Sequence, residues 1–210
     1  MTEKAFGLVV FASGTGSNFR AVYDSIKSGK LHAEVLGLIT NNPDAGARKF
    51  AEDNGIAVEI INGKRYPEEG GVTKRIMEVL EEWSPDLIIL AGYMKKLDRK
   101  IVAAYATKIL NIHPALLPSF GGKGMYGLHV HEAVLEYGVK FTGVTVHVVD
   151  FDYDAGPIVM QRIVPVLPDD TPEILQQRVL KEEHAIYSEA IKLFAEGKAS
   201  VEGRKVILQD

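Results

Sequence analysis

The strongest constraint on the fold is the regular alternation of short apolar runs with helix-like segments in the first half of the chain. The apolar runs predict strands at 6–12, 35–39, 58–61, 87–91 and 109–112. The segments between successive runs predict helices, because their apolar residues recur at helical spacing. Strands that are apolar throughout and alternate with helices indicate a parallel sheet with helices on both faces. The sequence therefore predicts an α/β fold.

The second half of the chain does not keep this regular alternation. After Asn111 it predicts a helix at 128–137, strands at 142–149 and 158–165, a long amphipathic helix at 173–196 and a strand pair at 199–201 and 205–208. We therefore expect a Rossmann-like, open and mostly parallel sheet, to which the C-terminal part adds antiparallel strands and a long helix. Without a repeat or a linker, the chain is expected to form a single domain over 1–210, with halves at 1–110 and 111–210.

Composition narrows the classes of function that this chain can serve. The net charge of −4 argues against a general nucleic-acid-binding protein, because such proteins present a basic face. The absence of cysteine excludes disulfides, thiolate catalysis and cysteine-ligated metals. The apolar run near the N-terminus ends at Ser13 and is too short for a signal peptide or a membrane span. We therefore expect a cytoplasmic protein that binds neither nucleic acid nor membranes.

A glycine-rich loop, SGTGSN at 13–18, separates the first predicted strand from the first predicted helix. Unpaired N–H groups at a helix N-terminus favour an anion, and glycines let the backbone approach it closely. Ser17 and Asn18 add side-chain donors. Phe19 stands where a dinucleotide-binding loop has its third glycine, and no Gly-Lys-Ser/Thr follows. The loop therefore favours a single phosphate group, and the alternative is a tight turn in which Ser17 caps the helix.

Asn111 and His113 lie at the end of the fifth predicted strand, in the sequence NIHP. Residues two apart in an extended chain project from the same face, and ligands of open α/β sheets bind at the carboxyl ends of strands. An amide can donate to an oxyanion, and an imidazole can act as an acid or base near neutral pH. The pair is therefore a candidate catalytic site. The alternative is a strand-end turn with a backbone-bonded histidine.

Three aspartates, Asp150, Asp152 and Asp154, fall on alternate positions after the strand at 142–149. Asp154 precedes an Ala-Gly-Pro turn, which restrains its direction. A carboxylate beside an imidazole raises the imidazole's pKa and orients it, so Asp154 is the best partner for His113. The alternatives are a solvated acidic loop or a cation site. The glycine and the glutamate that an EF-hand loop requires are absent.

The sequence around the remaining histidines, and around Glu183, gives a less specific indication of function. His129 and His131 are two residues apart on a predicted helix and so do not face each other, which favours a helix-start cap or a surface pair over a zinc site. His147 alternates with valines and faces either the same cleft or the interior of the sheet. Glu183 and His184 fall on the long helix, where a solvated face is expected.

Six motifs, in order and at matching spacing, resemble the phosphoribosylglycinamide formyltransferase family. They are S-G-x-G-S-N at 13–18, A-G-Y-M at 91–94, N-I-H-P-A-L-L-P at 111–118, T-G-V-T-V-H at 142–147, D-A-G-P at 154–157 and E-H-A-I-Y at 183–187. The resemblance covers essentially the whole chain. It implies transfer of a formyl group from 10-formyltetrahydrofolate, the co-substrate, to glycinamide ribonucleotide in purine biosynthesis, without a metal. The N-terminal half would bind the nucleotide, and the C-terminal half would be catalytic and bind folate.

The resemblance also implies the roles of individual residues. The catalytic residues would be Asn111, His113 and Asp154. The ribonucleotide would be bound by Gly16, Ser17, Asn18 and Glu183. The folate would be bound by Met94, Lys95, Lys96, Leu97, Asn111, Phe151, Asp152, Tyr153 and Asp154. Lys95 and Lys96 depart from the Arg-apolar pair common in the family. The partners would be these small molecules, with the chain as a monomer or homodimer.

Three other functions share part of this pattern. A methionyl-tRNA formyltransferase would need an RNA-binding domain, for which the chain has neither length nor basic charge. A formyltetrahydrofolate deformylase-like hydrolase would carry a regulatory domain before the first strand and would not need a phosphate loop. A non-catalytic nucleotide-phosphate sensor would keep the glycine loop, but it would not require Asn111, His113 and Asp154.

Overall fold

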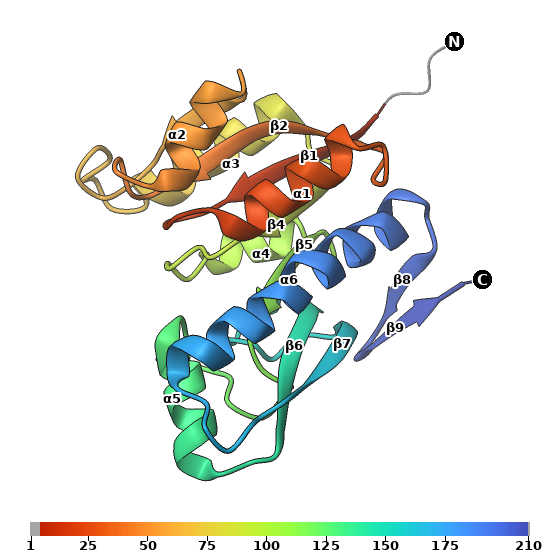
Figure 1. Cartoon of the computed structure of the whole chain (residues 1–210). Helices are drawn as coiled ribbons and strands as arrows, with labels where there is room; N and C mark the ends of the chain where they lie inside the picture. Colours follow the sequence, from red (N-terminus) through yellow and green to blue (C-terminus); the bar gives the residue numbers. More distant parts are fainter. Residues whose placement is uncertain (1–4, 210) are drawn as a thin grey trace. The chain divides into compact units, whose positions relative to one another are not determined.

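The computed structural model describes residues 5–209, which fall into two compact units divided between Leu110 and Asn111 (Figure 1). The predicted domain limits at 1 and 210 lie outside the described residues, and the single-domain assignment stays a prediction. Among residues 5–209, none of the helices combines the length and apolar character needed to cross a membrane.

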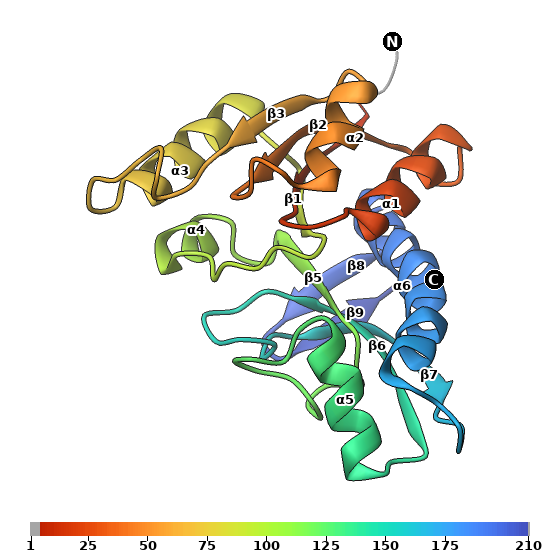
Figure 2. The ribbon, with the colours of Figure 1, turned by 60° about the vertical axis from the view of Figure 1, so that its left-hand side comes forward.

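The first unit alternates strands and helices as predicted. Its elements are β1 (Phe6–Phe11), α1 (Ser17–Lys27), β2 (Ala33–Thr40), α2 (Gly46–Asp53), β3 (Ala57–Ile60), α3 (Gly71–Trp83), β4 (Leu87–Leu90), α4 (Arg99–Ala104) and the start of β5 (Ile109–His113). The strands follow the order β3-β2-β1-β4-β5, and β1 pairs in parallel with both β2 and β4. Helices α1 and α2 lie on one side of this sheet, and α3 and α4 lie on the other (Figure 2).

Burial explains why the sequence of the central strand β1 is apolar. Leu8, Val9, Val10 and Phe11 of β1 are all fully buried, as expected for a central strand covered on both faces. Gly37 of β2 lets α3 approach the sheet closely, because a Cβ at this position would lie 2.3 Å from the Trp83 ring. A tightly packed core therefore supports the carboxyl ends of β1, β2 and β4 and the loops that follow them.

The second unit contains the end of β5, α5 (Leu128–Tyr137), β6 (Phe141–Val148), β7 (Ile158–Pro165), α6 (Pro172–Ala195), β8 (Ala199–Glu202) and β9 (Lys205–Leu208). Its strand order is β5-β6-β7-β9-β8, with β6–β7 and β8–β9 antiparallel. Helix α6 begins at a standard cap, since Thr171 Oγ1 accepts a hydrogen bond from Ile174 N–H at 3.3 Å. The predicted fold class is confirmed, with element ends shifted by a few residues.

Candidate active site

Four polar side chains converge in the second unit, from the end of β5, from β6 and from the loop that follows β6. Asn111 Nδ2 lies 3.1 Å from His147 Nε2 and 3.5 Å from Asp154 Oδ1. His147 Nε2 lies 3.5 Å from the same Asp154 oxygen, and His113 Nδ1 lies 3.6 Å from Asp154 Oδ2. The structure thus brings together the three predicted catalytic residues. His147, which the sequence left undecided, belongs to the same cluster.

His113 is held as a neutral imidazole with a defined tautomer. Its Nε2 lies 2.8 Å from the Phe120 carbonyl, which can only accept, so Nε2 carries the hydrogen and Nδ1 faces Asp154. Burial lowers the pKa of His113 and outweighs the raising effects of Asp154 and of the Phe120 carbonyl. Asp154 raises this pKa as predicted, but the net shift is downward, because burial penalises the charged imidazole more strongly. At neutral pH, His113 can accept a proton at Nδ1.

Asp154 is fixed by its backbone and stays ionised. Its φ of 52° lies in the left-handed region, and its Oδ2 accepts a hydrogen bond from Gly122 N–H at 2.8 Å. Burial alone would raise the pKa of this carboxyl, but the hydrogen bond with His147, the positive charge that His113 carries when protonated and the Gly122 N–H together hold it below its usual value. Gly156 is required in the turn that follows, because a Cβ there would lie 1.8 Å from the Val148 carbonyl oxygen. The carboxylate is thus directed at the two histidines.

A buried network fixes the chain just beyond His113. Thr145 Oγ1 donates to the Ala115 carbonyl at 2.7 Å and accepts from Leu117 N–H at 3.1 Å. Gln161 Nε2 donates to Thr145 Oγ1 at 2.9 Å and to the Leu117 carbonyl at 3.0 Å. Thr145 is fully buried, so β6 and β7 set the direction in which the chain leaves β5. The alternation of Thr145 with His147 was the available sequence signal for this role.

The predicted phosphate loop lies in the first unit, at the N-terminus of α1. Gly16 is the N-cap residue with φ of 77°, and Ser17 is the first helical residue, so the alternative in which Ser17 caps the helix is wrong. A Cβ at Gly16 would lie 2.7 Å from Ala47 Cβ, and Gly14 O accepts a hydrogen bond from Ala47 N–H at 3.1 Å. The loop therefore needs glycine at position 16 to pack against α2.

The predicted folate residues fall in both units. In the first, Lys95, Lys96 and Leu97 line a cavity of about 320 Å³ at the carboxyl end of the sheet, and Met94 is half exposed. In the second, Phe151, Asp152 and Tyr153 lie in the loop between β6 and β7. Glu183, the predicted ribonucleotide contact on α6, is buried rather than solvated as the charge pattern suggested.

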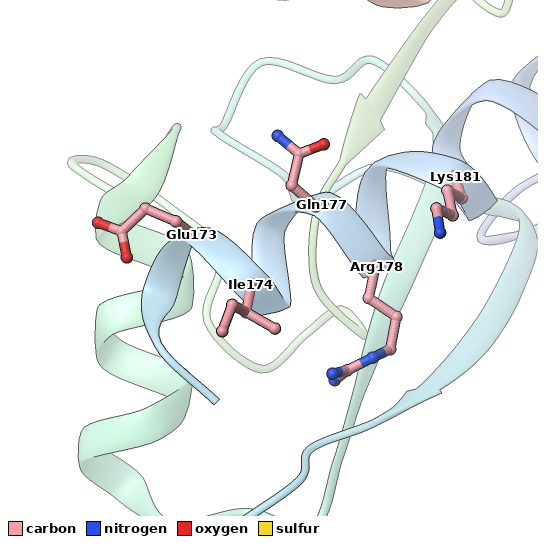
Figure 3. Close-up of a pocket in the computed structure, with 5 residues that line it drawn as sticks. All are labelled: Glu173, Ile174, Gln177, Arg178 and Lys181. Carbon is pink, nitrogen blue, oxygen red and sulfur yellow. The ribbon is translucent and has the colours of Figure 1, made fainter. Parts of the chain in front are cut away.

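A surface hollow on α6 lies apart from the predicted site residues. It is lined by Glu173, Ile174, Gln177, Arg178 and Lys181, whose side chains diverge rather than meet (Figure 3). Arg178 is engaged elsewhere, since its two terminal nitrogens each lie 2.6 Å from an oxygen of Asp170. This hollow has no convergent set of reactive groups, and we assign it no chemistry.

His129 and His131 have different surroundings on α5. His129 is exposed and lies 3.0 Å from Glu132, whereas His131 is 1% exposed and its Nδ1 has no hydrogen-bond partner among residues 5–209. The prediction of a surface pair or a helix-start cap is therefore wrong for His131, which faces inward with Val130 and Val134. Within the described part of the chain, no group of three or more His, Cys, Asp or Glu is placed to hold a metal ion.

The burial of His131 predicts a specific loss of stability in acid. Burial, aided by the charge of His113, lowers the pKa of His131 to about 4 from an ordinary 6.5. The unfolded chain therefore binds more protons, and the free energy of unfolding falls as pH drops below the ordinary pKa. Between pH 7 and pH 5 this amounts to about 2 kcal/mol. We expect His131→Leu to reduce the wild-type pH dependence by that amount in urea unfolding.

The exposed neighbour supplies the control for this prediction. His129→Leu should keep the wild-type difference between pH 7 and pH 5, because His129 is exposed on the same helix and is not taken out of water on folding as His131 is. An unchanged difference in His131→Leu would show that His131 is not buried in its neutral form.

Comparison with known proteins agrees with this geometry. Residues 7–191 match the family described as formyl transferase. The chain is 45% identical over 190 residues to the chloroplastic phosphoribosylglycinamide formyltransferase of Arabidopsis thaliana, covering 90% of this chain and 65% of that protein. It is 35% identical over 191 residues to the phosphoribosylglycinamide formyltransferase of Escherichia coli K12, covering 91% of this chain and 88% of that protein.

A solved structure gives the same result. The crystal structure of glycinamide ribonucleotide transformylase 1 from Symbiobacterium toebii superposes with a TM-score of 0.91 at 39% identity, covering 98% of this chain and 95% of that one. This chain spans less than two thirds of the Arabidopsis relative's own length but most of the two bacterial ones. The match over residues 7–191, together with these relatives, shows that the chain belongs to the formyl transferase family.

Proposed function

We propose that this chain transfers the formyl group of 10-formyltetrahydrofolate to the amine of glycinamide ribonucleotide, a step of purine biosynthesis. The observation that carries the proposal is the buried cluster of an amide, two imidazoles and an ionised carboxylate in a formyl transferase chain. Relatives named for this activity support formyl transfer and the ribonucleotide acceptor, and the folate donor is the one that the family resemblance implies. The cytoplasmic location and the monomeric or homodimeric state stay predictions.

The reaction follows from the chemistry of three residues in the cluster. The glycinamide amine attacks the formyl carbon, which forms a new C–N bond and a tetrahedral oxyanion. The Asn111 amide donates a hydrogen bond to that oxygen. Neutral His113 accepts the proton of the attacking amine at Nδ1, and the ionised Asp154 beside it stabilises the imidazolium. The proton then passes to N10 as the C–N10 bond breaks and tetrahydrofolate leaves.

The folate and the ribonucleotide are assigned to loops at strand ends. The segment Met94–Leu97 and the loop Phe151–Asp154 would contact the folate, in part through backbone groups. Lys95 and Lys96 are exposed, and both line the 320 Å³ cavity, so they would give this segment more positive charge than an Arg-apolar pair. Gly16, Ser17 and Asn18 would hold the ribonucleotide phosphate, and Glu183 would contact the same substrate.

The phosphate assignment predicts a change in substrate affinity. Replacing Ser17 by Ala and Asn18 by Leu removes two side-chain donors beside the N-terminus of α1. Hydrogen bonds to a charged group contribute about 1.5–3 kcal/mol each, so the loss of two leads us to expect the KM for glycinamide ribonucleotide to rise roughly 10²- to 10⁴-fold. Steady-state kinetics with each substrate varied in turn will measure this. The KM for the folate serves as the internal control, and an unchanged KM for the ribonucleotide would refute the phosphate role.

The acceptor specificity distinguishes the proposed function from its alternatives. We expect purified protein with 10-formyltetrahydrofolate to form formylglycinamide ribonucleotide when glycinamide ribonucleotide is present, and to release little formate when it is absent. Formate release at the same rate with and without the ribonucleotide would identify a hydrolase instead. Ribonucleotide binding without turnover would identify a sensor, and formylation of methionyl-tRNA would identify a tRNA-modifying enzyme.

A further inference from the structure

Ser13, which directly precedes the glycine loop, uses both its backbone and its side chain to join three strand ends of the first unit. Its N–H donates to the Gly92 carbonyl at 3.1 Å, and its carbonyl accepts from Asn42 Nδ2 at 3.1 Å. Its hydroxyl donates to Asn41 Oδ1 at 2.5 Å and accepts from Met94 N–H at 2.9 Å. The side chains and backbone groups after β1, β2 and β4 therefore meet at one residue.

The hydroxyl of Ser13 is the part of this network that depends on the side chain. A hydroxyl can donate one hydrogen bond while it accepts another, and this one does both. Ser13 is 7% exposed, so water would replace neither partner fully if the hydroxyl were removed. Asn41 is anchored in turn, because its carbonyl accepts a hydrogen bond from Asn62 Nδ2 at 2.9 Å. The hydroxyl thus connects the Met94 backbone to a fixed point at the end of β2.

The two segments that Ser13 connects are those to which the two substrates are assigned. Gly14–Asn18 continues directly from Ser13, and Met94 is the first residue of the folate segment. Met94 is 50% exposed, so packing restrains it only in part, and its backbone hydrogen bond to Ser13 adds a further restraint. A loop held in its binding conformation before the ligand arrives loses less entropy when the ligand binds.

We propose that Ser13 is a positioning residue that fixes the glycine loop and the Met94–Leu97 segment relative to each other, so that both substrates bind to preformed loops. This inference rests on the proposed function, which assigns the ribonucleotide phosphate to the loop and the folate to the segment. Ser13 touches neither reacting group, so its loss should weaken the binding of both substrates and leave the chemical step nearly unchanged.

Ser13→Ala tests this inference through the separation of KM from kcat. Removing the hydroxyl loses two hydrogen bonds, and we expect the KM values for both substrates to rise about 5- to 30-fold while kcat changes less than about 3-fold. The matched control is Ser28→Ala, since Ser28 is exposed and its hydroxyl donates to the Ser25 carbonyl at 3.1 Å. That variant should keep both KM values.

The outcomes separate this inference from a structural role and from the proposed function itself. A merely structural role would lower the melting temperature or the active fraction, and hence kcat, at unchanged KM, and that result would overturn the inference. If Ser13→Ala does not fold, Asn41→Leu provides the test, because it removes the acceptor of the Ser13 hydroxyl. A rise in both KM values of that variant would support the inference, and wild-type KM values would overturn it. Absence of turnover in the wild-type chain would instead refute the proposed function.

Discussion

Asp154→Asn is expected to lower kcat for formyl transfer by about 10³-fold with the fold retained. The substitution keeps the size of the side chain, and asparagine tolerates the left-handed backbone of this position, where φ is 52°. It removes the negative charge that lies 3.6 Å from His113 Nδ1 and 3.5 Å from His147 Nε2. Without that charge, the imidazolium formed when His113 accepts a proton has no counter-ion in a buried site.

The same substitution four residues earlier gives the control. Asp150 is exposed, and its carboxylate accepts a hydrogen bond from the adjacent Phe151 N–H. Asp150→Asn should therefore keep kcat close to that of the wild type. Steady-state rates at saturating substrates, with circular dichroism to confirm folding, will measure both variants. A folded Asp154→Asn variant that turns over at near wild-type rate would remove the carboxylate from the mechanism.

His113→Ala is expected to lower kcat by about 10²–10⁴-fold, the range that a positioned general acid or base contributes. His113 is 3% exposed and is held between the Phe120 carbonyl and Asp154. Because the site is buried, a base from solvent does not replace the imidazole in the variant. The exposed His129 provides the matched control, and His129→Ala should retain full activity. Thermal unfolding must accompany the kinetics, because removing a buried imidazole leaves a cavity.

The pH dependence of the wild-type rate gives an independent test of His113. Burial lowers the pKa of His113, so the acid limb of kcat/KM should lie below the ordinary histidine pKa of 6.5. Activity is thus expected to be constant on the neutral side and to fall on acidification, when His113 becomes protonated before the reaction. In His113→Ala this limb should disappear from the residual activity. An acid limb that persists unchanged in this variant would show that it arises from the protonation of a group other than His113.

The sequence predicted the fold well because each element of the first unit carries a local signal. Strand β1 is apolar at every position, which is typical of a strand covered on both faces. Helix α1 begins directly after Gly16, as the glycine loop indicated. The order of the last strands could not be predicted in this way. Strand β9 joins β7 in parallel through a single pair, Ile158 with Lys205, and nothing local to either residue specifies that pairing.

The candidate site was predictable where residue type and strand position agreed. Asn111, His113 and Asp154 were found from a strand end, a restrained turn and the family motifs. His147 was left undecided, because alternation along β6 does not say which face meets the site. His131 was wrongly assigned to a surface pair or a helix-start cap because it is polar. Its spacing of three residues from Val134 would have placed it on the buried face of α5. The direction of the His113 pKa shift depends on burial, which the sequence does not reveal.

The most direct test of the central claim, that His113 and Asp154 act as one catalytic unit, is a double-mutant cycle measured by single-turnover formyl transfer to glycinamide ribonucleotide. Residues that act as a unit have strongly non-additive effects. We predict that the double variant His113→Ala, Asp154→Asn will react at a rate within about 3-fold of the slower single variant. A double variant whose loss equals the product of the two single losses would show independent action and contradict the mechanism.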